Sequence, residues 1–317
     1  MRSLVTGGAG FIGSNLVDAL VARGDEVLVV DDLSNGREAN LSGVLGSGAE
    51  LLVADLAGDE AAAAHARFGP DVVFHLGAQA DVRKAVDDPA HDAGVNVIGT
   101  IAVLEAARRS GSRVVFAATG GAVYGEGEGR ALPFPESAAP APETPYGVSK
   151  LAGELYVAMY RRLHGVPGIA LRFANVYGPR QDPHGEAGVV AIFCGRLLDG
   201  AAPRVFGDGL QTRDYVFVAD TVAALLAADA ALAGEAPPAG PLNIGTGRET
   251  SVLELVAELA SISGLPFEAE LSPARQGEVQ RVAIDPAAAG EELAWRPETD
   301  LRDGLARTLD SVRSSRG

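Results

Sequence analysis

The chain has 317 residues, of which 47% are hydrophobic, and its formal net charge is −16. This length suffices for two domains, or for one large domain with an appended lobe, and for an ample apolar core. The acidic balance argues against a nucleic-acid-binding surface, because phosphate backbones bind to an excess of Lys and Arg. A few local arginines can still hold the phosphates of a small anionic substrate.

The cysteine, histidine and hydropathy patterns exclude several further classes. Cys194 is the only cysteine, so an intrachain disulfide is impossible. The five histidines are scattered and no Cys-x-x-Cys pattern occurs, so we expect no metal site. The N-terminus lacks the zones of a signal peptide, and no apolar run reaches the ~18 residues of a membrane span. We therefore expect a cytoplasmic protein without a membrane or nucleic-acid partner.

Short apolar runs alternate with helical patterns in the first half of the chain. The runs are rich in Val, Leu and Ile and lack two-residue alternation, as expected for strands that are buried on both faces. Strand–helix alternation predicts an α/β fold, a Rossmann-type doubly wound parallel sheet with right-handed crossovers. The predicted strands are 3–6, 26–30, 51–54, 72–76, 113–117 and 168–173, and the predicted helices are 11–23, 94–110 and 145–164.

The pattern changes after about residue 175. Helical stretches at 188–198, 219–232, 251–263 and 301–312 are separated by turns rich in Gly and Pro and by short strands. We expect residues 1–174 to form the sheet domain. Residues 175–317 should form mainly a smaller α/β lobe over the carboxyl edge of the sheet, with some segments returning to the first domain.

A glycine-rich turn joins the first predicted strand to the first predicted helix. Gly7, Gly10 and Gly13 give the spacing Gly-x-x-Gly-x-x-Gly, which permits a tight turn and close backbone approach to a pyrophosphate. Asp31 and Asp32 end the next strand, where a carboxylate accepts hydrogen bonds from ribose hydroxyls and repels a 2′-phosphate. The pattern predicts an NAD site in residues 1–174; the alternative is that the two acids cap a turn.

A Tyr-x-x-x-Lys pair begins the helix predicted at 145–164. Tyr146 and Lys150 are four residues apart and therefore share one helix face. The ammonium can then stabilise a tyrosinate and lower the phenol pKa from about 10 toward the working range. Lys84 and Lys150 are the only lysines, which favours a chemical role. The alternative is a packed tyrosine beside a solvated lysine.

Together these motifs resemble the extended short-chain dehydrogenase/reductase family, most closely its UDP-glucose (UDP-galactose) 4-epimerases. Further similar motifs are Asp55-Leu56, the run from His75 to Ala80, Asn96 in Asn-Val-Ile-Gly-Thr, and residues 171–179. The resemblance covers nearly the whole chain and implies a homodimeric enzyme with an NAD cofactor. The residues expected to contact NAD are Gly7, Gly10, Phe11, Ile12, Gly13, Asp31, Asp32, Asn35, Asp55, Leu56, Leu76, Gly77, Ala78, Gln79, Asn96, Tyr146 and Lys150.

One segment departs from the family pattern. The family's catalytic serine aligns with Gly120, so we expect the preceding Thr119 to supply the hydroxyl that bonds the reacting oxygen. Family dehydratases and decarboxylases carry an acid at Gly121 or Ala122, and this chain has none. The resemblance therefore implies an isomerase that epimerises C4 of a UDP-sugar through a transient 4-keto sugar.

The resemblance also implies where the substrate binds. Arg213 would contact the diphosphate, and Arg275 and Glu278, in an Arg-x-Gly-acid element, would hold phosphate and nucleotide ribose. The expected substrate contacts are Thr119, Gly120, Tyr146, Asn175, Val189, Arg213, Arg275 and Glu278. The alternatives are UDP-glucuronate or UDP-N-acetylglucosamine 4-epimerisation, and after them a dehydratase, a reductase or a non-catalytic NAD-binding protein.

Overall fold

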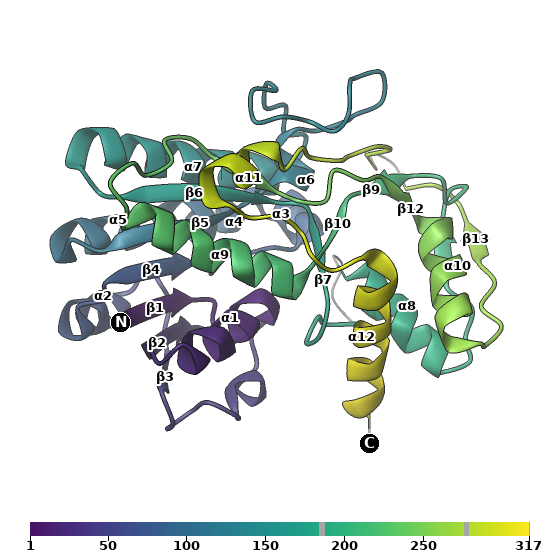
Figure 1. Cartoon of the computed structure of the whole chain (residues 1–317), viewed down its shortest axis with the longest axis horizontal. Helices are drawn as coiled ribbons and strands as arrows, with labels where there is room; N and C mark the ends of the chain where they lie inside the picture. The colour runs from purple at the N-terminus through teal and green to yellow at the C-terminus, as the bar shows by residue number, and fades with distance from the viewer. Residues whose placement is uncertain (184–187, 276–278, 317) are drawn as a thin grey trace.

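A seven-stranded parallel sheet forms the centre of the protein in this computed structural model, which describes residues 1–183, 188–275 and 279–316. The strand order is β11-β6-β5-β4-β1-β2-β3 (Figure 1). The predicted doubly wound parallel sheet is confirmed. Its strands are β1 (Arg2–Thr6), β2 (Glu26–Asp31), β3 (Ala49–Val53), β4 (Val72–His75), β5 (Arg113–Thr119), β6 (Gly168–Phe173) and β11 (Leu242–Ile244).

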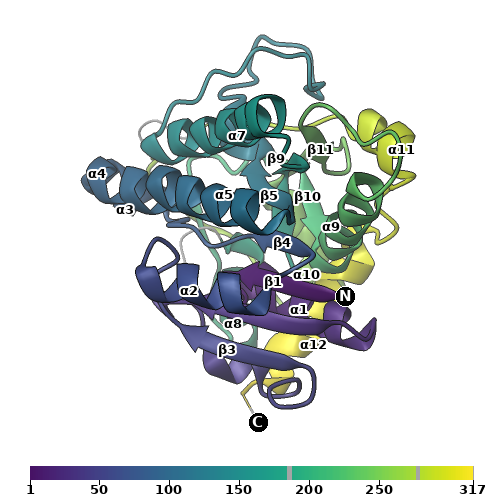
Figure 2. The ribbon, with the colours of Figure 1, turned by 90° about the vertical axis from the view of Figure 1, so that its left-hand side faces the viewer.

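Helices cover both faces of the sheet, as the two ribbon views show (Figures 1 and 2). Leu16, Leu20 and Leu225 belong to the buried cluster on one face, and Leu104 and Val157 to the cluster on the other. Each such side chain contributes about 1.5–3 kcal/mol on burial. The first face is covered by α1 (Phe11–Ala22), α9 (Val218–Leu232) and α11 (Ala287–Leu293), and the second by α2 (Asp59–Phe68), α5 (Gly99–Ser110) and α7 (Pro145–His164).

The helix predicted at 94–110 differs from the structure at its start. It is preceded by α3 (Val82–Asp87) and α4 (Pro89–Ala93), and its first turn is the π-helical segment η2 (Gly94–Ile98), after which α5 begins. The Asp88 carboxylate caps α4 by accepting from the His91 backbone N–H at 2.9 Å. The hydrophobic pattern missed α4 because its inward-facing side chain is polar. π-Helical turns of this kind occur frequently at functional sites.

A smaller lobe lies beside the carboxyl ends of the central strands (Figure 1). It is built around a separate buried cluster that includes Phe193, Leu255 and Leu305. The chain does not stay in this lobe after residue 175, because α9 and β11 return to the central sheet. The lobe contains the strand pairs β7 (Asn175–Tyr177) with β10 (Tyr215–Phe217), β8 (Arg204–Phe206) with β13 (Glu270–Ser272) and β9 (Thr212–Arg213) with β12 (Thr250–Ser251), and the helices α8 (Val189–Leu198), α10 (Val252–Ser263) and α12 (Leu301–Ser314).

Among the described residues, no helix has both the length and the apolar character that a membrane span needs.

Candidate active site

The glycine turn between β1 and α1 is a cradle that larger residues would fill. A Cβ atom at Gly13 would lie 2.1 Å from the Gly7 carbonyl oxygen, and one at Gly7 would lie 2.7 Å from the Gly77 nitrogen. Gly7 also has a φ of +68°, which favours glycine. No side chain caps the start of α1, since Gly10 is its N-cap. These features fit the pyrophosphate of a dinucleotide, which binds backbone N–H groups at a helix start.

The two acids at the end of β2, Asp31 and Asp32, make different contacts. The buried Asp31 accepts hydrogen bonds from the backbone N–H groups of Ala9 and Leu33, both at 2.9 Å, so its carboxylate lies against the glycine turn. Burial raises the pKa of Asp31. Asp32 is exposed and accepts from the Ser34 backbone N–H at 2.9 Å and from its hydroxyl at 2.6 Å. Asp32 therefore makes the turn-capping contact considered above as an alternative, and Asn35 beside it is exposed.

The segment after β4 lies next to the glycine turn. The Gly77 backbone N–H donates to Thr6 Oγ1 at 3.1 Å. Leu56 packs over Gly77 and Gly99, where added Cβ atoms would lie 2.9 and 2.3 Å from its methyl groups. Leu76 and Ala78 flank Gly77 and are half-buried, whereas Asp55 is exposed and accepts from the Ala57 N–H at 2.8 Å.

The first turn of α1 also contacts the smaller lobe. Phe11 and Ile12 are half-buried and pack against the lobe's apolar cluster. Asn15, one turn later, donates to the Pro179 carbonyl at 3.2 Å. The predicted cofactor site and the lobe are therefore joined at this helix.

Helix α7 presents the predicted Tyr–Lys pair to the carboxyl end of β5. Thr144 caps the helix by accepting from the Gly147 N–H at 3.2 Å, and Pro145 occupies its first turn. Lys150 is only 3% exposed, donates to the Ala117 carbonyl at 2.9 Å and lies 5.0 Å from the centre of the Phe116 ring. Tyr146 is half-buried one turn earlier.

In the protein without cofactor or substrate, the pKa values of Tyr146 and Lys150 differ from the lowered phenol pKa that the sequence predicted. Burial, and after it the charge of Asp92, raises the pKa of Tyr146 above its usual value. Burial lowers the pKa of Lys150 to about 8, against an opposing effect of Asp92. The expected lowering of the phenol pKa is therefore absent from the protein alone, because desolvation disfavours the phenolate.

A buried polar cluster lies behind the pair and joins two of the expected NAD contacts, Gln79 and Asn96, to Asp92, which the sequence reasoning missed. Asn96 and Gln79 exchange backbone and side-chain hydrogen bonds, both at 2.9 Å. Asp92 accepts from the side chains of Asn96 at 3.0 Å and Gln79 at 3.2 Å. The only signal in the sequence is the four-residue spacing of Asp92 and Asn96, which places them on one helix face.

Thr119 ends β5 beside two glycines. Its Oγ1 accepts from the Ala122 N–H at 3.3 Å and so caps the short helix α6 (Gly120–Val123). A hydroxyl that accepts here keeps its own O–H to donate. A Cβ atom at Gly121 would lie 3.4 Å from Asn175 Oδ1 and 3.9 Å from Thr119 Oγ1. Thr119 and Asn175 thus flank Gly121, while Gly120 is buried against Ile284.

The remaining predicted substrate residues lie on the lobe. Arg213, on β9, is half-buried and donates to the Thr212 carbonyl at 2.8 Å. Arg275 is exposed, with its guanidinium 3.7 Å from the centre of the Phe206 ring. Val189 is half-buried at the start of α8. Glu278 lies outside the described residues.

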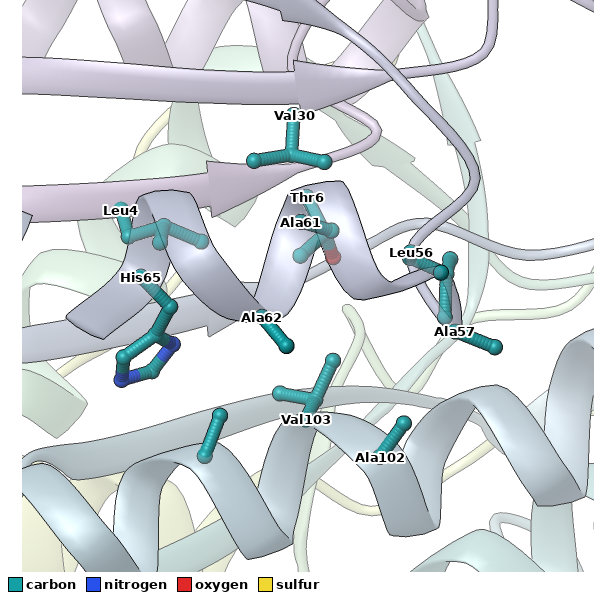
Figure 3. A pocket seen from close by; sticks show the side chains of 12 residues that line it. Leu4, Thr6, Val30, Leu56, Ala57, Ala61, Ala62, His65, Ala102 and Val103 are labelled. Carbon is teal, nitrogen blue, oxygen red and sulfur yellow. The ribbon is translucent and has the colours of Figure 1, made fainter. Parts of the chain in front are cut away.

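A small cavity between α2 and α5 borders the expected NAD contact Leu56 and none of the described substrate residues (Figure 3). Its volume is about 40 Å³, and its lining is mostly apolar, with Leu56 at one end and His65 at the other. A space of this size holds no more than water. It is a packing gap caused by the small alanine side chains on the two helices. Within the part of the chain that is described, no cluster of three His, Cys, Asp or Glu residues forms a metal site.

A family model described as the NAD dependent epimerase/dehydratase family matches residues 3–245. The chain belongs to this family. One curated relative, UDP-glucose 4-epimerase of Mycolicibacterium smegmatis, is 47% identical to this chain over 316 residues, which cover 99% of each chain. The family inferred from the sequence motifs is confirmed.

Solved structures of epimerases share the fold of this family member. UDP-glucose 4-epimerase from Thermotoga maritima, solved with UDP-glucose, superposes with a TM-score of 0.92 at 42% identity and covers 100% of each chain. The enzyme from Thermus thermophilus, solved as a complex with NAD, gives a TM-score of 0.89 at 40% identity, covering 99% of this chain and 100% of that one.

Proposed function

We propose that this protein is an NAD-dependent UDP-sugar 4-epimerase of the UDP-glucose 4-epimerase type. The observation that carries the proposal is the position of the Tyr146–Lys150 pair. Lys150 bonds the backbone of β5, and a Cβ atom at Gly147 would lie 2.6 Å from the Ala122 carbonyl oxygen, so the start of α7 lies against the β5–α6 turn. The turn carries Thr119, and the sheet carries the glycine cradle.

Each residue of the pair has a defined task in this reaction. Tyr146, once ionised, takes the proton from the sugar 4-hydroxyl, and Lys150 supplies the positive charge that favours the phenolate. Thr119 donates its free O–H to the reacting oxygen. NAD, when bound, accepts the hydride from C4 and returns it. When the hydride is returned to the opposite face of the transient 4-keto sugar, the epimer forms. Tyr146 then gives its proton back to the oxygen on C4.

The substrate would be held by its diphosphate so that the sugar can turn. Arg213 and Arg275 offer guanidinium groups, which match phosphate oxygens. Arg213 lies on β9 and Arg275 follows β13; the Thr212 N–H donates to the Gln280 carbonyl at 2.8 Å, so the chain lies beside β9 five residues after Arg275. Gly121 and Ala122 provide no acid for an elimination, which supports epimerisation over dehydration.

The test is incubation of the NAD-loaded protein with UDP-glucose, followed by chromatographic separation of the epimers. We expect UDP-galactose, with the mass unchanged. Parallel reactions with UDP-glucuronate and UDP-N-acetylglucosamine identify the preferred sugar. A product lighter by one water would point to a dehydratase, and absence of turnover on a panel of UDP-, dTDP- and GDP-sugars, despite bound NAD, would point to a non-catalytic protein.

We further propose that two copies pair through α5 and α7. Exposed apolar side chains support the proposal: Ile98, in η2 directly before α5, is 58% exposed, and Val148 and Leu155 on α7 are 54% and 60% exposed. Burying them against a second copy would remove this apolar surface from water. Analytical ultracentrifugation should give a dimer, and Leu155→Glu should give a monomer.

A further inference from the structure

Asp92 is a buried carboxylate with one unsatisfied oxygen. The residue lies on α4 and is only 1% exposed. Its Oδ1 accepts two hydrogen bonds, from Gln79 and Asn96, whereas its Oδ2 has no hydrogen-bond partner in the described structure. Leaving a charged oxygen buried without a partner costs more than the ~1–3 kcal/mol of a neutral group. A carboxylate in this position needs a compensating positive charge.

Hydrogen bonds tie Asp92 to the turn of α7 that carries the Tyr–Lys pair. Helix α4 packs against α7. The Asn96 amide, which donates to Asp92, also donates to Ser149 Oγ at 3.2 Å, and Ser149 Oγ donates to the Tyr146 carbonyl at 3.0 Å. Asp92 is therefore fixed relative to Lys150, the residue that follows Ser149.

Three titratable side chains belong to the elements around the Lys150 ammonium. Tyr146 belongs to the same helix, His75 to β4 and Asp92 to α4. Burial, together with the charge of Lys150, lowers the pKa of His75 to about 3, so the imidazole is neutral at working pH. Tyr146 is a neutral phenol until the reaction ionises it. Of these groups, Asp92 is the only carboxylate.

We propose that Asp92 is a positioning residue that acts through Lys150, as the buried counter-charge that keeps the ammonium protonated. Its effect on turnover rests on the proposed function, whereas its effect on the protonation of Lys150 is independent of that function. The direction of the electrostatic effects agrees with this role, because Asp92 raises the pKa of Lys150 and that of Tyr146.

Neutralising Asp92 should move both ionisations in one direction. Asp92→Asn removes the negative charge, so the pKa values of Lys150 and Tyr146 both fall. The reaction needs Tyr146 ionised and Lys150 protonated. Both limbs of the pH–rate profile should therefore move to lower pH, whereas a variant with merely looser packing loses rate without a displacement of either limb.

The lysine can be observed directly because the chain contains only Lys84 and Lys150. Full-length protein labelled with carbon-13 in lysine should give two side-chain NMR signals, and Lys84→Arg identifies the exposed one. We expect Asp92→Asn to lower the titration midpoint of Lys150 by about 1 pH unit. Asp88→Asn is the matched control, since it removes a carboxylate at the exposed cap of the same helix and should leave the midpoint unchanged.

The outcomes separate the inference from the proposed function. A Lys150 midpoint in Asp92→Asn equal to that of the unaltered protein overturns the inference, whatever the activity. If Asp92→Asn lowers the Lys150 midpoint but the unaltered protein turns over no UDP-sugar, the inference is supported and the proposed function is rejected. Asp92→Glu keeps the charge and should restore the midpoint. If Asp92→Asn does not fold, Asp92→Ser, which also removes the charge, takes its place with the same expected shift.

Discussion

The Arg172 guanidinium on β6 binds the Glu154 carboxylate on α7 through two parallel hydrogen bonds, Nε to Oε2 at 2.9 Å and Nη2 to Oε1 at 2.5 Å. Both side chains are buried. Glu154 lies one helical turn after Lys150, and Arg172 also donates to the Tyr124 hydroxyl at 2.7 Å. This pair anchors α7 to the sheet.

Glu154→Gln should strongly destabilise the protein. It leaves a buried guanidinium without its counter-charge, for which we expect a loss of about 3–5 kcal/mol in the free energy of unfolding. Glu258→Gln is the control, because Glu258 pairs with Arg302 at 2.9 Å on the surface and such pairs contribute about 0–1 kcal/mol. Urea unfolding measures both. Equal losses in the two variants would show that the buried pair does not anchor α7.

Gly13→Ala should weaken NAD binding. The added methyl group would lie 2.1 Å from the Gly7 carbonyl oxygen, which belongs to the backbone of the turn and cannot move aside without opening it. We expect NAD affinity to fall more than about tenfold, equivalent to about 1.4 kcal/mol, with a lower melting temperature. Gly43→Ala, where the methyl group meets nothing within 4 Å, should leave calorimetric NAD binding unchanged.

The sequence predicted the sheet because its strands are continuous runs of Val, Leu and Ile that fit burial on both faces. The helix predicted at 145–164 from its pattern coincides with α7, and the structure shows that Thr144 and Gly165 cap its two ends. The return of β11 to the sheet has no local signal of this strength, since the strand is only Leu242–Ile244 and its pairing with β6 spans about 70 residues of chain.

The candidate site was predictable where a motif reflects local geometry and not where it depends on tertiary packing. The glycine turn and the Tyr146–Lys150 spacing are local. The surroundings of Asp92 come from α4, the π-helical turn and α7 together, so no short pattern encodes them. The same packing raises the pKa of Tyr146 by burial, which the four-residue spacing alone could not reveal.

Tyr146→Phe should abolish epimerisation while NAD still binds, because the ring remains and only the group that exchanges the proton is lost. Loss of a general base lowers turnover roughly 100- to 10,000-fold. Tyr160→Phe is the matched control on the same helix; it removes a hydrogen bond to Glu105 at 2.8 Å far from the pair. A Tyr146→Phe enzyme with near-normal turnover of UDP-glucose would disprove the assigned base.

Acid should destabilise the protein partly through His65. Burial lowers the pKa of this imidazole from 6.5 to about 4, so the unfolded chain binds a proton in this range that the folded protein rejects. Stability contributed by the neutral histidine is therefore complete above pH 6.5 and is lost as the pH falls toward 4, at up to about 1.4 kcal/mol per pH unit. Urea midpoints should depend less on pH in His65→Gln than in the exposed-site control His91→Gln. Identical slopes in the two variants would contradict this assignment.

Phe206 should matter for substrate affinity because it positions Arg275. The guanidinium lies 3.7 Å from the centre of the ring, and such a contact at an exposed site contributes about 0.5–1 kcal/mol. Phe206→Leu should therefore raise KM for UDP-glucose about two- to fivefold with little change in kcat, and Arg275→Met should raise it further. Arg204 lies 5.9 Å from the same ring and donates to Ser272 at 3.0 Å instead, so Arg204→Met should leave KM unchanged. If Arg275→Met also leaves KM unchanged, this arginine does not contact the diphosphate, and the ring serves only the packing of the lobe.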